Sequence, residues 1–154
     1  MSIAYLSLGS NIGKKEANCE EAVRRLQATD GIEIKKRSQV YLTSPIGGPP
    51  QTDYLNGVLK IDTVLPPENL LEILKGVEKD MGRKTPAGRD YPRVIDIDIL
   101  LYDDIVVETD ALTIPHLRMH ERYFVLRGLC EIDSDLMHPV LGKTVEELYE
   151  KVAD

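Results

Sequence analysis

The sequence predicts an α+β protein whose elements follow the ferredoxin-like order β-α-β-β-α-β. Apolar residues occur at strand spacing over residues 3–8, 32–42, 54–64 and 93–102. Two segments with helical spacing separate these strands, one over residues 14–29 and one that opens at Pro66. There is no internal repeat or interdomain linker, so we expect the 154 residues to form one domain with a sizeable core.

The first strand ends at Gly9-Ser10-Asn11, a turn that leads into the first helix. Such a turn can present backbone N–H groups to an anion. It lacks both the Gly-x-x-x-x-Gly-Lys-Ser/Thr pattern and the G-x-G-x-x-G pattern. The favoured interpretation is therefore an ordinary turn with a polar start to the helix.

Proline and glycine mark the remaining boundaries. A loop rich in both covers residues 43–50, and Pro66-Pro67 opens the second helix because proline fits a first turn. A polar connection over residues 82–91 leads into the fourth strand. Beyond that strand we expect a short strand over residues 105–107 and helices over 121–130 and 144–152.

The fourth strand, residues 93–102, is the most informative segment. Its alternation predicts one apolar face, made by Ile95, Ile97, Ile99 and Leu101. The other face carries Val94, Asp96, Asp98, Leu100 and Tyr102. Two carboxylates about 7 Å apart on one face repel each other, and a divalent cation removes that repulsion. We therefore favour a metal site over an exposed sheet face that merely carries acids.

The charge distribution limits the partners. A net charge of −7 disfavours nonspecific nucleic-acid binding, which needs basic patches. Six basic residues nevertheless flank the aspartate strand in sequence: Arg83, Lys84, Arg89, Arg93, Arg118 and Arg122. Beside a candidate metal site they resemble a polyphosphate clamp, and solvated surface is the alternative.

The two cysteines say little about compartment, and the cytoplasm is the default for a sequence without targeting or membrane signals. Cys19 and Cys130 form neither a metal spacing nor a redox pair. No signal peptide precedes the first strand, and no run approaches the ~20 apolar residues of a spanning helix. We expect a cytoplasmic protein with no membrane partner.

Three single residues could line a site. His116 could donate a hydrogen bond to phosphate, although a lone histidine is more often structural. Phe124 could form a wall of a stacking pocket or belong to the core. Asn56 could read the edge of a heterocycle or occupy a strand-end turn.

Together these residues resemble the family of 6-hydroxymethyl-7,8-dihydropterin pyrophosphokinases, enzymes of folate biosynthesis. The resemblance runs nearly end to end, and it is specific because of the order and spacing of its motifs. The motifs are Leu8-Gly9-Ser10-Asn11, Tyr41-Leu42-Thr43-Ser44-Pro45-Ile46-Gly47, Asp53-Tyr54-Leu55-Asn56, Met81-Gly82-Arg83, Pro92-Arg93-Val94-Ile95-Asp96-Ile97-Asp98-Ile99-Leu100, Pro115-His116 and Arg122-Tyr123-Phe124.

The resemblance implies a single pyrophosphokinase domain over residues 1–154, with helices packed on a mainly antiparallel sheet as an α/β/α sandwich. It also implies transfer of pyrophosphate from ATP to the pterin hydroxymethyl group, which gives the pterin diphosphate and AMP. ATP is then a co-substrate and two Mg²⁺ ions are cofactors. We expect a monomer that binds no nucleic acid.

The resemblance also assigns residues by position. Asp96 and Asp98 would hold the Mg²⁺ ions and act in catalysis with Arg83 and Arg93. ATP contacts would come from Glu78, Arg83, Arg93, Ile99, His116 and Arg122. The pterin pocket would be lined by Thr43, Ser44, Ile46, Tyr54, Asn56 and Phe124, with Phe124 stacked on the ring. Residues 82–91 would form a mobile lid.

Two positions depart from the family pattern. Asp90 stands where a tryptophan usually covers the pterin, and Tyr91 is the candidate replacement. Ser44 stands where the family often has proline, which implies a less rigid loop. Neither change touches the aspartate strand.

Two rival functions fit parts of the pattern. Nucleotidyltransferases also pair a Gly-Ser turn with Asp-x-Asp on a strand, but those elements normally lie close in sequence, whereas Ser10 and Asp96 are far apart. A ligand-sensing module is the other rival, since ferredoxin-like folds often serve that way. A sensor needs no paired strand carboxylates beside an arginine.

Overall fold

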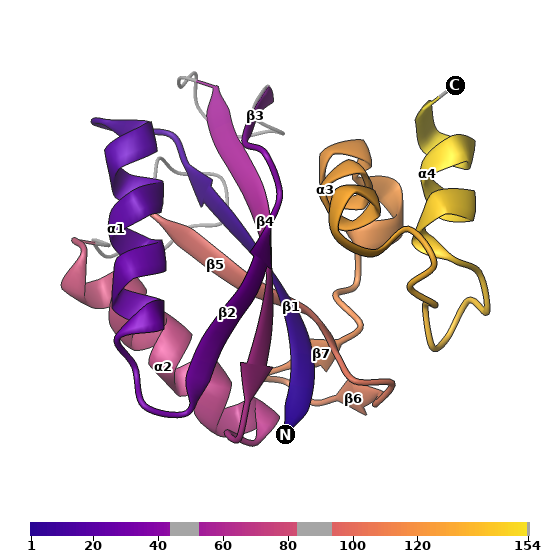
Figure 1. Ribbon diagram of the computed structural model, residues 1–154, viewed down its shortest axis with the longest axis horizontal. Coiled ribbons are helices and arrows are strands. Elements are labelled where there is room, and N and C mark those ends of the chain that lie inside the picture. The colour runs from indigo at the N-terminus through magenta and orange to yellow at the C-terminus, as the bar shows by residue number, and fades with distance from the viewer. Residues whose placement is uncertain (44–52, 83–93, 154) are drawn as a thin grey trace.

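The computed structural model describes residues 1–43, 53–82 and 94–153 (Figure 1). The loop predicted over residues 43–50 and the lid predicted over residues 82–91 lie almost wholly outside these ranges. The described elements are β1 (Ser2–Ser10), α1 (Lys15–Gln27), β2 (Ile32–Arg37), β3 (Tyr41–Thr43), β4 (Tyr54–Thr63), α2 (Pro67–Asp80), β5 (Asp96–Tyr102), β6 (Val107–Glu108), β7 (Thr113–Ile114), the 3-10 turn η1 (Met119–Glu121), α3 (Tyr123–Asp133) and α4 (Val145–Ala153).

The main sheet has the strand order β2-β4-β1-β5. β3 also pairs with β4, at residues 54–56, whereas β2 pairs with residues 59–63. Every neighbouring pair in it is antiparallel. β6 and β7 form a separate two-stranded sheet. With β2 and β3 taken together as one edge strand, this order and the β-α-β-β-α-β connectivity confirm the predicted ferredoxin-like arrangement.

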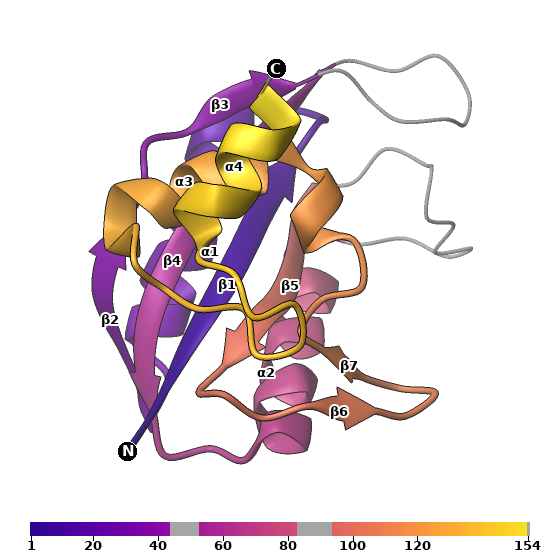
Figure 2. The ribbon, with the colours of Figure 1, turned by 90° about the vertical axis from the view of Figure 1, so that its right-hand side faces the viewer.

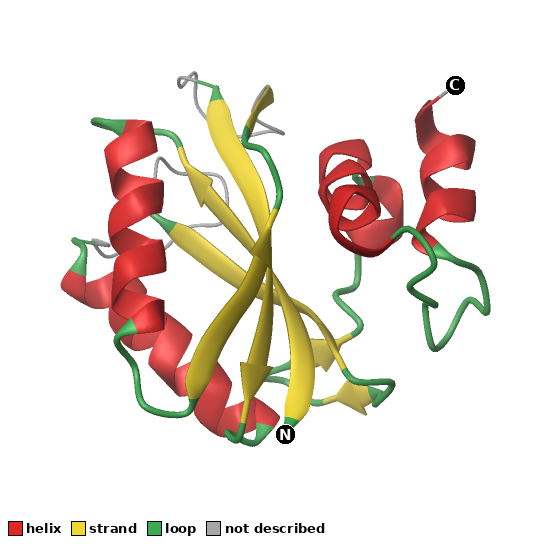
Figure 3. Ribbon diagram, in the orientation of Figure 1, coloured by secondary structure: helices red, strands yellow, loops and turns green. Residues whose placement is uncertain are grey.

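The sheet lies between two helical layers, as Figures 1 and 3 show, with α1 and α2 on one face and α3 and α4 on the other. The α1/α2 core contains Leu6, Leu26, Ile61, Leu74 and Ile97 among its buried side chains. The α3/α4 core contains Tyr5, Val58, Leu101, Leu126 and Val145. Because the sheet is covered on both faces, the face that carries the aspartates is only partly open to solvent.

The alternation predicted for the aspartate strand holds as far as Ile99 and then changes. β1 pairs with Ile99 and next with Leu101, so Leu100 is an extra residue that forms a β-bulge. The bulge turns Leu101 into the α3/α4 core and Tyr102 into the α1/α2 core. The predicted placement of Leu101 with the isoleucines and of Tyr102 with the aspartates is therefore wrong.

The strand predicted over residues 32–42 is two strands, because the ladder with β4 is interrupted at Ser38. The Ser38 N–H donates to the Val58 carbonyl at 2.9 Å. In return, the Val58 N–H donates to the Ser38 hydroxyl at 2.9 Å. A side chain thus replaces the backbone acceptor of the ladder, and regular pairing stops there.

The other predicted elements lie within a few residues of the observed ones, whereas β7 and η1 were not predicted. β1 is longer than predicted and includes Gly9 and Ser10, which were expected in a turn. The short strand expected over residues 105–107 begins only at Val107. Within the three described ranges, no helix combines the length and apolar character that crossing a membrane requires.

A polar contact attaches the end of α3 to the sheet. The Tyr5 hydroxyl donates to Asp133 Oδ2 at 2.5 Å, and Lys60 Nζ lies 2.7 Å from the same oxygen. Burial opposes ionisation of Asp133, but the hydrogen bonds from Lys60 and Tyr5 outweigh it and hold the pKa of the carboxyl below its usual range. Burial, followed by the bond to Asp133, raises the pKa of Tyr5. A charged carboxylate and a neutral phenol therefore coexist at neutral pH.

α3 also packs closely against β4, and Figure 2 shows it lying across the sheet. A Cβ at Gly128 would lie 2.6 Å from Val58 Cγ2, so Gly128→Ala forces the helix away from the strand.

We expect the Gly128→Ala variant to lose about 1–3 kcal/mol of unfolding free energy. Gly76→Ala is the matched control, because its Cβ would meet no atom within 4 Å. It should gain about 0.5–1 kcal/mol. Urea unfolding measures both, and equal changes in the two variants would contradict close packing of α3.

Candidate active site

The register of the sheet brings three of the predicted site residues, Asn56, Asp96 and Asp98, to one face. On β1, Gly9 pairs with Asn56 of β4 on one side and with Asp96 of β5 on the other. Ser7, two residues earlier, pairs with Asp98 of β5. Alternate residues of a strand share a face, so the two aspartates and Asn56 lie on the face covered by α3 and α4. Strand spacing puts the backbones of Asn56 and Asp96 about 10 Å apart.

Gly9 keeps the surface between Asn56 and Asp96 free of a side chain. A Cβ at this position would lie 3.1 Å from Asn56 Oδ1 and 3.4 Å from the Tyr54 ring. Sequence reasoning missed this role because it assigned Gly9 to a turn. A glycine inside a strand is the signal that could have found it, since it often marks a close approach by another group.

Hydrogen bonding to β3 orients the Asn56 amide. Its Nδ2 donates to Thr43 Oγ1 at 2.6 Å, and Thr43 is buried. The Asn56 carbonyl oxygen is then the end of the amide that approaches Gly9. Tyr54 pairs with Thr43 across the strands, so these three predicted pterin residues lie together. Ser44 and Ile46 lie outside the described residues.

α3 contributes aromatic and cationic groups to the same face. Phe124, in the first turn of α3, is half-buried and packs against the α3/α4 core. Its ring meets that of Tyr123 edge-on, with the centroids 5.8 Å apart. Arg127, one turn further, lies over the Tyr41 ring of β3 at 4.4 Å from the centroid. The cation–π contact ties α3 to the strand that carries Thr43.

Glu78 of α2 supports the strand between the two aspartates. The Ile97 N–H donates to Glu78 Oε2 at 2.7 Å, and Glu78 is only 3% exposed. Because β5 is an edge strand, this carboxylate supplies an acceptor that a neighbouring strand would otherwise provide. Asp96 and Asp98 on either side are half-buried. A contact between Glu78 and ATP stays a prediction.

The bulge in β5 anchors the next predicted residue. The Leu100 carbonyl accepts a hydrogen bond of 2.9 Å from the His116 N–H. His116 Nδ1 accepts from the Arg118 N–H at 3.2 Å, so the neutral ring carries its proton on Nε2. Nε2–H is therefore the ring group suited to donate to a phosphate oxygen.

η1 connects His116 to Arg122, the residue that precedes α3. The Met119 N–H donates to the His116 carbonyl at 3.3 Å, and the Arg122 N–H donates to the Met119 carbonyl at 3.3 Å. Both His116 and Arg122 are half-buried. The side chain of Ile99 is buried in the α1/α2 core, so an ATP contact at that position would have to come from its backbone. Arg83 and Arg93 lie outside the described residues.

Comparison with known proteins identifies the family. Residues 5–134 match the 7,8-dihydro-6-hydroxymethylpterin-pyrophosphokinase family. A 2-amino-4-hydroxy-6-hydroxymethyldihydropteridine pyrophosphokinase of Methylorubrum extorquens is 45% identical over 152 residues, which is 99% of this chain and 94% of that protein. The chain belongs to this pyrophosphokinase family, which confirms the resemblance found in the sequence. The reaction of this family is the transfer of pyrophosphate to hydroxymethyldihydropterin in folate biosynthesis.

Other similar proteins are much longer than this chain. Folic acid synthesis protein fol1 of Schizosaccharomyces pombe is 43% identical over 150 residues, which is 97% of this chain and 20% of that protein. A crystal structure of Plasmodium falciparum HPPK-DHPS with pteroate superposes with a TM-score of 0.77 at 18% identity. The superposition covers 97% of this chain and 42% of that one, and at this identity it supports the fold alone.

The surface at Gly9, between Asn56 and Asp96, leads to a prediction for substrate binding. Gly9→Ala should retain the fold, because Gly9 lies in a strand and the added methyl meets side chains that can shift. Affinity for 6-hydroxymethyl-7,8-dihydropterin should fall about tenfold or more, a loss of ~1.4 kcal/mol, measured by calorimetric titration. Gly57→Ala is the control, since it adds a methyl to the next strand on the opposite face. Wild-type affinity in Gly9→Ala would remove this surface from the pterin site.

Proposed function

We propose that this chain transfers pyrophosphate from ATP to the hydroxymethyl group of 6-hydroxymethyl-7,8-dihydropterin, releasing AMP, with Mg²⁺ held by Asp96 and Asp98. One observation carries the proposal. The pairing of Gly9 with Asn56 and with Asp96 brings an oriented amide and a pair of carboxylates to the same face. A heterocycle and a metal-bound polyphosphate could therefore meet above Gly9.

The amide side suits a pterin. With its nitrogen engaged by Thr43, Asn56 keeps a carbonyl acceptor toward Gly9 for the N–H groups on the edge of the ring. Tyr54 and Phe124 supply aromatic surface, and the missing side chain at Gly9 allows a flat ring to approach the sheet. Ser44 and Ile46 complete the proposed pocket on the strength of the resemblance.

The carboxylate side suits Mg²⁺. In the described part of the chain, no group of three or more His, Cys, Asp or Glu side chains could hold a metal. A pair of carboxylates is nevertheless a fitting donor set, because Mg²⁺ is usually bound by one or two carboxylates together with substrate phosphates and waters. When bound, the metal would neutralise oxygens along the triphosphate. The charge, half-burial and shared face of Asp96 and Asp98 fit that group.

The remaining chemistry is positioning and charge stabilisation. The hydroxymethyl oxygen attacks the β-phosphorus in line, the bond from that phosphorus to the bridging oxygen breaks, AMP leaves with that oxygen, and the hydroxyl proton passes to water. Arg122 and the Nε2–H of His116 are suited to stabilise phosphate oxygens, and Arg83 and Arg93 are assigned to the same task. Asn56 and Phe124 fix the direction of attack by holding the ring.

The wider assignments rest on the same resemblance. We propose residues 1–154 as one pyrophosphokinase domain that acts as a monomer in the cytoplasm. The two rival functions differ in products and in metal dependence. A nucleotidyltransferase releases free pyrophosphate, and a sensor for another ligand shows no Mg²⁺-dependent ATP binding.

Nucleotide product analysis tests the proposal. Purified protein incubated with hydroxymethyldihydropterin, ATP and Mg²⁺ should form AMP and pterin diphosphate one to one, measured by chromatography. EDTA should abolish turnover. Asp96→Asn should keep the fold but lose turnover by roughly 100-fold or more, since loss of one transition-state partner commonly costs about 3 kcal/mol.

The control variant removes a carboxylate from the same sheet. Asp62→Asn, in β4, makes the same charge change at a residue that forms an ion pair with Lys35, whose Nζ lies 3.8 Å from Asp62 Oδ2. It should retain turnover. A stoichiometric ADP peak would overturn the pyrophosphokinase proposal, and near-normal turnover of Asp96→Asn with unchanged Mg²⁺ dependence would remove Asp96 from the site.

A further inference from the structure

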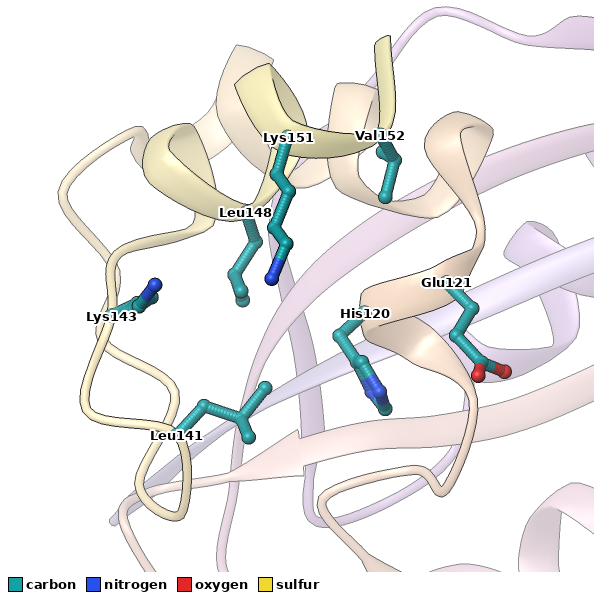
Figure 4. Close-up of a pocket in the computed structure, with 7 residues that line it drawn as sticks. All are labelled: His120, Glu121, Leu141, Lys143, Leu148, Lys151 and Val152. Atoms are coloured by element: carbon teal, nitrogen blue, oxygen red, sulfur yellow. The ribbon is translucent and has the colours of Figure 1, made fainter. Parts of the chain in front are cut away.

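A pocket of about 490 Å³ lies between η1, α4 and the segment that precedes α4 (Figure 4). It is lined by His120, Glu121, Leu141, Lys143, Leu148, Lys151 and Val152. None of these residues belongs to the candidate active site. The volume falls in the range of about 300–1,000 Å³ that is typical of small-molecule sites.

The lining combines an apolar wall with two ammonium groups. Leu141, Leu148 and Val152 supply the apolar surface. Figure 4 shows Lys151 extending into the pocket between Leu148 and His120, with Lys143 beyond Leu148 on the side away from His120. A small molecule that fits this lining needs an apolar body and a polar end.

The balance of charge decides the sign of that polar end. The one lining carboxylate, Glu121, lies 3.9 Å from Arg118 Nε, and Figure 4 shows it pointing away from both lysines. Glu147, near Lys143, is held by Thr144, whose N–H donates to its carboxylate at 3.0 Å. The lining itself holds two ammonium groups and one carboxylate, an excess of positive charge in a chain of net charge −7. It favours an anion.

Hydrogen bonds hold the wall between His120 and Leu141 in place. His138 is 4% exposed, and its Nδ1 accepts from the N–H groups of Val140 and Leu141 at 3.2 and 3.1 Å. Burial, with a contribution from His120, lowers the pKa of His138 and keeps this acceptor neutral. The two rings meet edge-on, with the centroids 6.4 Å apart. A pre-formed wall reduces the entropy lost on binding.

We propose that this pocket binds a small organic anion, with its carboxylate or phosphate between Lys143 and Lys151 and its apolar body against Leu141, Leu148 and Val152. The proposal is independent of the pyrophosphokinase assignment, because it uses none of those residues. The pocket and the candidate active site share only η1, which joins His116 to Arg122.

Methyl NMR of the full-length chain tests the proposal, with benzoate and phenyl phosphate as anionic probes and benzamide as the uncharged analogue of benzoate. Benzoate should shift the methyl signals of Leu141, Leu148 and Val152 in a saturable manner, with a Kd on the order of 1 mM for so small a fragment. Phenyl phosphate shows whether the site prefers phosphate. Benzamide should bind at least about tenfold more weakly if the lysines select an anion.

Charge-removing variants keep the test specific. Lys151→Met and Lys143→Met retain an unbranched apolar stem, and each should weaken benzoate binding about fivefold or more while benzamide binding stays unchanged. Lys75→Met, at an exposed position of α2, makes the same charge change elsewhere and should leave both unchanged. Absence of saturable shifts at these methyls, equal binding of benzamide, or undiminished binding in both pocket variants would each overturn the proposal.

Discussion

The pairing of β1 with β4 on one side and with β5 on the other is the constraint on which the candidate active site depends. Gly9 of β1 pairs with Asn56 on one side and with Asp96 on the other, so the three residues form one row across the sheet. A shift of either pairing by one residue would turn Asn56 or Asp96 to the opposite face. The large apolar residues of β1, among them Leu6 and Leu8, fix that register because they must enter the α1/α2 core.

Buried contacts along β5 hold the strand that carries Asp96 and Asp98 in place. Glu78 gives the outer edge of β5 an acceptor at Ile97, between the two aspartates. The bulge at Leu100 leaves a carbonyl that docks His116. Asp96, Asp98 and His116 are thus attached to one short strand, which limits their relative movement, as the proposed phosphate site requires.

α3 links the candidate active site to the α3/α4 core. Its C-terminal end is attached to β1 and β4 through Asp133, and its middle packs on Val58 through Gly128. Its first turn carries Phe124, and Arg122 directly precedes it. Stability of the α3/α4 core and the position of the proposed pterin wall are therefore set by the same helix.

The sequence by itself determined the β-α-β-β-α-β order of the core, the apolar face made by Ile95, Ile97 and Ile99, the shared face of Asp96 and Asp98, and the family. These depend on local periodicity and on motifs that a single chain displays. Only the tertiary structure decided that Gly9 lies between Asn56 and Asp96, that Leu100 forms a bulge, and that Ser38 divides the second strand. Each of these depends on pairing between residues far apart in the chain. The apolar pattern of one strand selects a face, but its register and interruptions are set by the neighbouring strand.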